Sequence, residues 1–375
     1  MGGGVGLSVH APFRIATENT LFAMPETHIG LFPDVGGSFF LPRLDGFLGS
    51  FLGLTGHRLK GLDAFMAGIA THYIPQNRLE SLVERLAELD SPSMEIVNEA
   101  IDEFSADPVT SQEWKDWSLG GDVKAAIDHC FGFDSIQEIR DSLKAVHADE
   151  STSDRVKVWA KTALKSLEKA SPTSLEITLM QLRKGAKKSF ADCLKMEYRM
   201  VQRCLVENDF SEGVSALLVE KRSPKWSDLS PSLEQDYFGS DKALELDLVD
   251  DKSYMEYPHH CLSGLPTVQD VRSVFEGSAQ RGATYDINSP EDIVQFFLNE
   301  WGAFDSTLIG SVKHGFRTAE IAIKGGNGYA KVGLKEKVVA IVEENVSVGQ
   351  DGRMIWSGRT RGVDASAKDE AETAV

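Results

Sequence analysis

The fold is decided by one stretch near the start of the chain, Met1-Gly2-Gly3-Gly4-Val5-Gly6-Leu7-Ser8, then Phe22-Ala23-Met24-Pro25-Glu26-Thr27, then Ile29-Gly30-Leu31-Phe32-Pro33-Asp34-Val35-Gly36-Gly37. It combines a glycine run with two carboxylates, Glu26 and Asp34, each directly after a proline. Glycine lacks a Cβ, so a ligand can approach its backbone N–H closely. A carboxylate in a fixed position can move a proton or attack a carbonyl. The pattern therefore predicts acyl chemistry, in which backbone donors hold an oxyanion.

Each of these features, taken alone, also has a simpler interpretation. The glycine run is compatible with a flexible chain start. Asp34 is compatible with an N-cap for a helix that begins near Val35. Glu26 is compatible with an exposed acid on a loop. The residue types alone leave both interpretations open at each position.

The combination resembles the crotonase (enoyl-CoA hydratase/isomerase) superfamily and, within it, the 3-hydroxyisobutyryl-CoA hydrolase family. The resemblance implies that Gly3 supplies a backbone N–H of the oxyanion hole, that Gly2 helps to bind the substrate, and that Glu26 and Asp34 are the acidic catalytic and substrate-binding residues. It is carried by the segments MGGGVGLSVH, FRIATE, LFAMPET, IGLFPDVGG, FLPRL, LTGHRLKG, AGIATHYI, SPTS, MEYR, DFSEGV and PKW.

Two positions distinguish the branches of this superfamily. Hydratases resemble one another in carrying glutamate where this chain has Gly6, and glycine where it has Asp34. The chain therefore lacks the first acid of a hydratase and carries the aspartate of the hydrolase. This pair of differences is the most specific signal in the sequence.

The resemblance implies hydrolysis of 3-hydroxyisobutyryl-CoA, a short 3-hydroxyacyl thioester, to the free acid and coenzyme A in valine catabolism in the mitochondrion. Coenzyme A enters as part of the substrate, so we expect no separate cofactor and no metal site. The sequence does not separate a nucleophilic role of Glu26 from a general-base role. An alternative is a structural component of the mitochondrial small ribosomal subunit with reduced or no activity, because fungal relatives of the hydrolase occur there. A hydratase or isomerase is a weaker alternative.

Composition restricts the partners. The 375 residues include 39 Lys and Arg against 57 Asp and Glu, a net charge of −18. A chain this acidic has no general attraction for nucleic acid or for an anionic membrane, and we expect it to bind neither directly. We expect protein contacts instead, with mitochondrial ribosomal proteins in the alternative function, or a homo-oligomer when the protein is free. The four cysteines show no metal-binding spacing and are expected to be free thiols.

The expected fold is α/β, a crotonase-like spiral of ββα turns that lacks its N-terminal part, followed by a mainly helical C-terminal region. We expect a core at 1–90, a helical region that covers the active site at 91–226, a helical extension typical of longer, fungal-type members at 227–357, and a disordered tail at 358–375. Apolar spacing and turn residues predict strands at 13–17, 21–24 and 71–74 and helices at 4–11, 48–56, 62–69, 79–89, 151–169, 172–185, 289–301 and 310–329.

The family pattern also places strands and helices before the glycine segment. They carry a second oxyanion N–H, a further acidic substrate contact and part of the coenzyme A site. We expect the chain as written to lack them and to be a poor enzyme. Its strands at 13–17 and 21–24 would then lie beside an unpaired edge.

Overall fold

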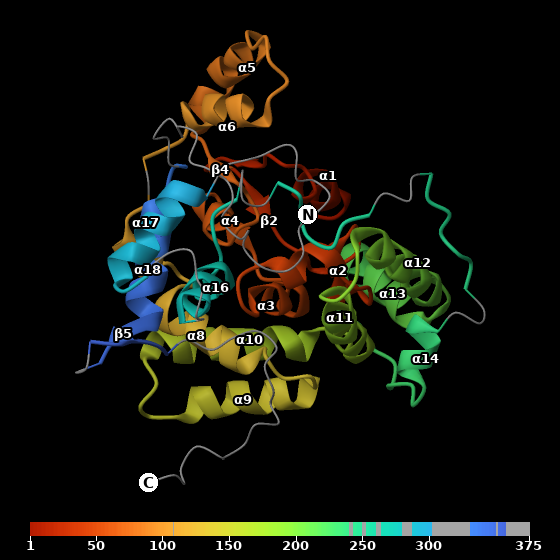
Figure 1. Ribbon diagram of the computed structural model, residues 1–375. Coiled ribbons are helices and arrows are strands. Elements are labelled where there is room, and N and C mark those ends of the chain that lie inside the picture. Colours follow the sequence, from red (N-terminus) through yellow and green to blue (C-terminus); the bar gives the residue numbers. More distant parts are fainter. Residues whose placement is uncertain are drawn as a thin grey trace.

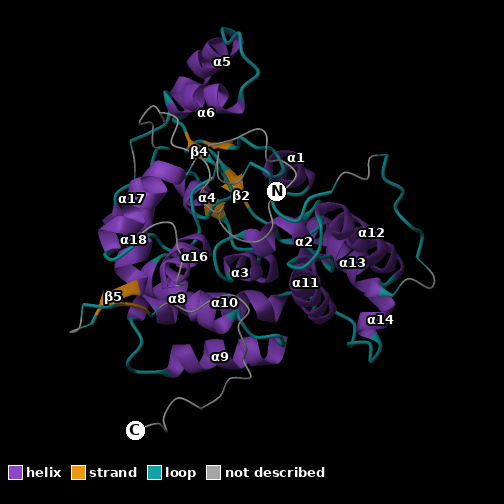
Figure 2. Ribbon diagram, viewed as in Figure 1, coloured by secondary structure: helices purple, strands orange, loops and turns teal. Residues whose placement is uncertain are grey.

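The computed structural model describes residues 1–107, 109–239, 243–249, 253–259, 264–279, 287–301, 331–349 and 352–357. Helices dominate; the short strands β2 and β4 lie near the centre, and β5 lies at the edge of the molecule (Figures 1 and 2). The blue helices α17 and α18 flank the red N-terminal core on one side, and the green helices α12 to α14 flank it on the other (Figure 1). The helix predicted at 310–329 and the tail predicted at 358–375 lie outside the described residues.

The N-terminal part alternates short strands and helices, as an α/β fold requires. Strand β1 pairs with β4 in parallel, with Ile15 opposite His72. Strand β2 pairs with β3 in the antiparallel sense, with Leu21 opposite Lys60. The elements are α1 (Gly3–Val9), β1 (Ile15–Ala16), β2 (Leu21–Phe22), η1 (Glu26–Ile29), α2 (Gly37–Phe40), η2 (Leu41–Arg43), α3 (Leu48–Thr55), β3 (Leu59–Lys60), α4 (Leu62–Met66), β4 (His72–Tyr73), η3 (Gln76–Arg78) and α5 (Leu79–Ala87).

The three strands predicted here are present but shorter than expected. A turn ends β1, because the Thr20 amide donates to the Thr17 carbonyl at 3.0 Å. Pro25 cannot donate a ladder hydrogen bond and stops the extended run after β2. In the described part of the chain β1 and β2 each have one strand partner, as edge strands do. Strand β3 is not among the predicted strands.

The middle of the chain is helical, as predicted. The Ser171 side chain accepts from the Ser174 amide at 3.0 Å and caps α11, whose first residue is Pro172. The elements are α6 (Met94–Asp102), α7 (Ser111–Asp116), α8 (Gly121–Cys130), α9 (Ile136–Ala148), α10 (Asp154–Lys169), α11 (Pro172–Gly185), α12 (Phe190–Val206), α13 (Asn208–Gly213), the π-helical η4 (Val214–Glu220) and α14 (Leu233–Phe238).

One hydrophobic core joins the strands to these helices. It includes the fully buried Phe51 and Phe131, and Trp159 of α10 packs on both rings at 5.7 and 6.3 Å. This core takes side chains from both sides of the boundary that we expected near residue 90. The four-part division of the chain stays a prediction.

The C-terminal extension has a small core of its own. The elements are α16 (Val268–Ala279), α17 (Pro290–Glu300), α18 (Leu334–Asn345) and a hairpin of β5 (Val346–Val348) and β6 (Met354–Trp356). On α17, Ile293 and Phe297 are buried in this core, whereas Phe296 is half-buried. Across the described ranges, we find no helix that combines the length and apolarity needed to cross a bilayer.

Candidate active site

Glu26 begins the 3₁₀-helix η1, directly after the buried pair Ala23 and Met24 and the turn at Pro25. Its residue surface is only 5% exposed, and its Oε2 atom has no hydrogen-bond partner among the described residues. Burial raises the pKa of Glu26 to about 7, and the nearby charge of Asp34 adds to the rise. Glu26 is therefore not the exposed loop acid of the simpler interpretation.

A close approach between two segments holds η1 in place. A Cβ on Gly30 would lie 2.2 Å from the Asp209 carbonyl, and a Cβ on Gly213 would lie 2.4 Å from the Ile29 carbonyl carbon. Only glycine therefore lets α13 rest directly on η1. The end of η1 also needs glycine, because Gly30 has a φ of 73°.

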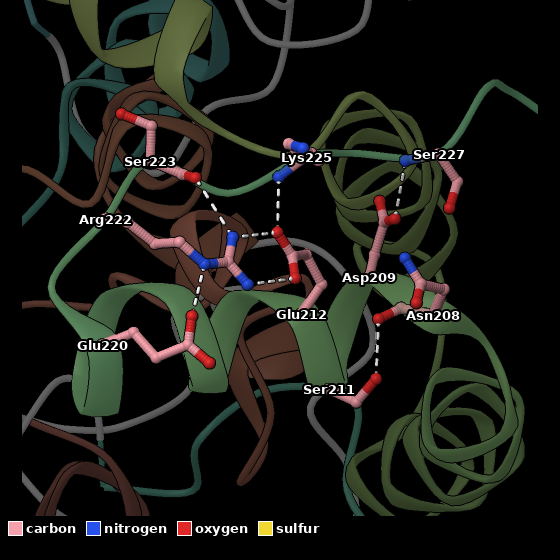
Figure 3. Close-up of polar contacts among 9 residues, drawn as sticks. All are labelled: Asn208, Asp209, Ser211, Glu212, Glu220, Arg222, Ser223, Lys225 and Ser227. Atoms are coloured by element: carbon pink, nitrogen blue, oxygen red, sulfur yellow. Dashed lines mark hydrogen bonds and ion pairs between the residues drawn. The ribbon is translucent and has the colours of Figure 1, made fainter.

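Figure 3 shows how α13 is held against the chain that follows it. The Glu212 carboxylate accepts hydrogen bonds from both terminal nitrogens of Arg222, at 2.5 and 2.8 Å, and from the Lys225 amide at 2.7 Å. Asp209 accepts from the Ser227 amide at 2.8 Å and, through its other oxygen, from the Ser171 hydroxyl at 2.6 Å. These contacts tie α11, α13 and the segment after η4 into one scaffold behind Glu26.

Asp34 lies in a turn with an unusual backbone. Val35 has a φ of 52° and Gly36 a φ of 86°. A positive φ at a β-branched residue is a genuine outlier that costs on the order of 1–3 kcal/mol and tends to occur at functional sites. Asp34 is half-buried, and burial raises its pKa. Its side chain does not cap α2, so the simpler interpretation of Asp34 as an N-cap is wrong.

Helix α1 packs directly on this turn. A Cβ on Gly6 would lie 2.6 Å from the Val35 Cβ and 2.9 Å from its carbonyl oxygen. The Nε2 atom of His10 lies 2.9 Å from the same carbonyl. The glycine run and the Asp34 turn are therefore one structural unit.

A third acid, Glu197, holds the other side of the turn. One carboxylate oxygen accepts from the Gly36 amide at 2.8 Å, and the other accepts from the amide of Ser38 at 2.9 Å and from its hydroxyl. Glu197 therefore supplies the cap of α2. Burial raises its pKa to about 7, and the charge of Asp34 adds to the rise.

The glycine run lies open at the start of α1. Gly3 and Gly4 are exposed, and a Cβ built on either would meet nothing within 4 Å. The first amides of a helix have no acceptor within the helix, and the first helical hydrogen bond here runs from Val5 to the Gly2 carbonyl. The first amides of α1 are therefore open, and Asp34 lies within electrostatic range of Glu26.

Sequence reasoning missed Glu197 and His10 as parts of this site. Glu197 had a detectable signal, because it interrupts a helical stripe of buried Cys193, Met200 and Cys204. A single acid at the 3.6-residue spacing of such a stripe indicates a buried, functional or capping carboxylate. We find no comparable sequence signal for His10. In the described part of the chain, no group of His, Cys, Asp and Glu side chains could hold a metal ion.

Together these groups can bind and move protons at a carbonyl. A buried carboxyl with a pKa near 7 exchanges protons efficiently at neutral pH, and open backbone amides stabilise a developing oxyanion. The charge of Asp34 acts on the pKa of both Glu26 and Glu197, so the three acids do not ionise independently.

Known proteins of two kinds are similar to this chain in sequence. A small ribosomal subunit protein, mS47 of Neurospora crassa, is 44% identical over 294 residues, which cover 74% of this chain and 57% of that protein. The mitochondrial 3-hydroxyisobutyryl-CoA hydrolase of Homo sapiens is 47% identical over 247 residues, which cover 65% of this chain and 61% of that protein. The chain thus spans about three fifths of the length of these curated relatives.

Solved structures give the same fold. A carnitinyl-CoA dehydratase from Mycobacterium thermoresistibile superimposes with a TM-score of 0.53 at 31% identity, covering 65% of this chain and 66% of that one. An enoyl-CoA hydratase from Rhodobacter sphaeroides gives 0.50 at 32% identity, covering 64% and 65%. The enoyl-CoA hydratase/isomerase family model matches residues 1–235. The chain therefore belongs to the enoyl-CoA hydratase/isomerase family, the crotonase superfamily that its glycine run and acidic loops resemble.

Proposed function

We propose that the protein hydrolyses a short 3-hydroxyacyl-CoA thioester, 3-hydroxyisobutyryl-CoA, to the free acid and coenzyme A. The observation that carries this proposal is the buried Oε2 of Glu26, which has no hydrogen-bond partner among the described residues, together with its raised pKa and the nearby charge of Asp34. The similarity to 3-hydroxyisobutyryl-CoA hydrolases adds support. Coenzyme A is part of the substrate in this reaction, and no further cofactor is proposed.

In this proposal the Gly3 amide donates to the carbonyl oxygen of the thioester, with Gly2 beside it. Glu26 in its carboxylate form either takes a proton from the attacking water or attacks the carbonyl carbon itself. In both routes the C–S bond breaks, coenzyme A leaves as the thiol after gaining a proton, and water supplies the oxygen of the free acid. Asp34 accepts a hydrogen bond from the 3-hydroxyl group of the substrate.

Gly6 disfavours the hydratase alternative on steric grounds. A glutamate there would place its Cβ 2.6 Å from the Val35 Cβ, a distance that real Cβ atoms essentially never show. The acid that hydratases carry at this position therefore has no room unless the Asp34 turn moves.

The direct test is Glu26→Gln. We expect the purified variant to lose more than about tenfold in the rate of thiol release from 3-hydroxyisobutyryl-CoA, because an amide neither takes up a proton nor attacks a carbonyl. Its melting temperature should stay close to that of the wild type. Glu80→Gln, at an exposed position on α5, is the matched control and should keep full activity. A Glu26→Gln variant with more than about a tenth of the wild-type rate contradicts the role of Glu26.

A second candidate is a structural role in the small subunit of the mitochondrial ribosome. The observation in its favour is that mS47 aligns with 74% of this chain, against 65% for the human hydrolase. Both candidates favour a mitochondrial location, which the name of the human relative states for that protein. Sedimentation of a lysate discriminates between them: co-migration with the small subunit supports the structural role, and migration as a free oligomer supports the enzyme.

A further inference from the structure

Residues 253–257, here called the strap, lie beyond the part of the chain that the family model matches. They are nevertheless attached to η2 and α12, two elements close to the site. The Arg43 guanidinium donates to the Met255 carbonyl, at 3.0 Å from Nε and 2.5 Å from a terminal nitrogen. At the start of α12, the Phe190 amide donates to the Tyr254 carbonyl at 2.9 Å. The strap is therefore fixed at both α2–η2 and α12.

The two tyrosines of the strap close an aromatic cluster. The ring of Tyr254 stacks on Phe190 at 5.2 Å with an interplanar angle of 5°. The ring of Tyr257 meets Phe39 edge-on at 5.0 Å and 85°. Stacked and edge-on pairs are the favoured geometries for aromatic rings. The packing thus fixes the hydroxyl of Tyr257 next to His10.

A chain of hydrogen bonds runs from this hydroxyl to the Asp34 turn. The Tyr257 oxygen lies 2.7 Å from Nδ1 of His10, and Nε2 of His10 lies 2.9 Å from the Val35 carbonyl oxygen. A carbonyl oxygen only accepts, so Nε2 carries the hydrogen. In the neutral ring Nδ1 then accepts, and the Tyr257 hydroxyl donates to it. Burial lowers the pKa of His10, and the charge of Arg14 lowers it further, so the neutral form is favoured.

This chain of hydrogen bonds ends at the carbonyl of Val35, the residue with the strained backbone. Val35 has a positive φ, a strained conformation that persists only where the surrounding structure holds it. On the basis of the proposed function, we propose that Tyr257 is a positioning residue for Asp34. It fixes the Nε2–H tautomer of His10, His10 holds the Val35 carbonyl, and the strained turn presents Asp34 to the 3-hydroxyl group of the substrate. The extension thereby contributes to the specificity of the site.

The test compares Tyr257→Phe with Tyr254→Phe. Both variants keep their rings, so the aromatic packing is retained. In the described part of the chain the Tyr254 hydroxyl makes no hydrogen bond, so Tyr254→Phe is a matched control. We expect Tyr257→Phe to lower kcat on 3-hydroxyisobutyryl-CoA about three- to tenfold, as the loss of one hydrogen bond allows, and to change KM less than about twofold. Tyr254→Phe should match the wild type.

A second readout does not depend on activity. In nitrogen-15 NMR of histidine-labelled protein, the wild type should show His10 as the neutral Nε2–H tautomer, and Tyr257→Phe should shift that signal together with the amide signals of Val35 and Gly36. An unchanged spectrum overturns the hydrogen-bond chain. A shifted spectrum with the kcat of the wild type overturns the positioning role. If the wild type has no thioesterase activity, the proposed function and the positioning role both fail, while the spectrum still decides whether Tyr257 fixes His10.

A double-mutant cycle separates positioning from general damage. In a His10→Ala background, whose folding is checked by melting, Tyr257→Phe should lower kcat by less than twofold further, because the intermediate link is already missing. An additional loss as large as in the wild-type background would show that Tyr257 acts by another route and would overturn the proposal.

Discussion

At the scale of single residues, the charge of Asp34 acts on both of the other acids of the site, Glu26 and Glu197. It raises the pKa of Glu26 and the pKa of Glu197, in each case as an addition to the larger effect of burial. Asp34 is itself the least buried of the three, and only the direction of its shift, upward, is resolved. In the proposed reaction the roles divide between two acids: the half-buried Asp34 contacts the substrate, and the buried Glu26 takes up a proton or attacks the carbonyl carbon.

This division predicts the substrate dependence of Asp34→Gly. We expect the variant to slow hydrolysis of 3-hydroxyisobutyryl-CoA at least about tenfold more than hydrolysis of isobutyryl-CoA, because a site built around a substrate hydroxyl discriminates through that hydrogen bond. Asp34→Asn keeps a hydrogen-bonding group and should retain more of the discrimination. Thiol release measures both rates. Equal losses on the two substrates would show that Asp34 serves the chemistry or the turn.

At the scale of elements, local signals were sufficient where one residue ends or starts a helix. The sequence predicted that α3 would end at Gly56, which has a φ of 62°, and that α11 would start at Ser171 and Pro172. It could not predict the cap of α2, because that cap comes from Glu197, far along the chain on α12. No rule of spacing links two such distant segments. The pair meets only because α2, α11 and α12 pack together.

The cap predicts a pH-dependent effect of Glu197→Gln. The pKa of Glu197 is about 7 in the folded state and 4.5 in the unfolded state. Between these two pH values the folded state therefore keeps a proton that the unfolded state has lost. The contribution of Glu197 to stability is therefore fully present below pH 4.5 and is lost as the pH rises through 7. Glutamine also places an amide donor against a backbone donor, so we expect the variant to be less stable by on the order of 1–2 kcal/mol.

The measurement is urea unfolding of both proteins at pH 5 and pH 8. The stability gap between wild type and Glu197→Gln should be larger at pH 5 and narrower at pH 8. Glu80→Gln serves again as the control and should show no gap at either pH. A gap that widens toward pH 8 would mean that the folded protein holds Glu197 as a stabilised carboxylate with a lowered pKa.

At the scale of the whole molecule, the extension is joined to the N-terminal core by buried charge as well as by the strap. Lys331 is 5% exposed, and its Nζ lies 3.0 Å from Nε2 of His72 and 3.8 Å from Asp102. Nε2 of His72 lies 3.2 Å from Asp102. Burial lowers the pKa of Lys331 to about 8 and the pKa of His72 to about 4. With His72 neutral, Lys331 is the cation that balances the buried Asp102 carboxylate.

That balance predicts the cost of Lys331→Met. The substitution leaves Asp102 buried beside a neutral histidine, and removing one partner of a buried pair costs on the order of 3 kcal/mol. Lys335→Met is the matched control on the same segment. Lys335 is exposed, so its substitution should change the free energy of unfolding by no more than about 0.5 kcal/mol. Urea unfolding at pH 7 measures both.

The double variant Asp102→Asn with Lys331→Met removes both charges and should regain part of the lost stability, because the two sites are coupled. If Lys331→Met is as stable as Lys335→Met, the buried charges do not attach the extension, and its other contacts with the core must do so.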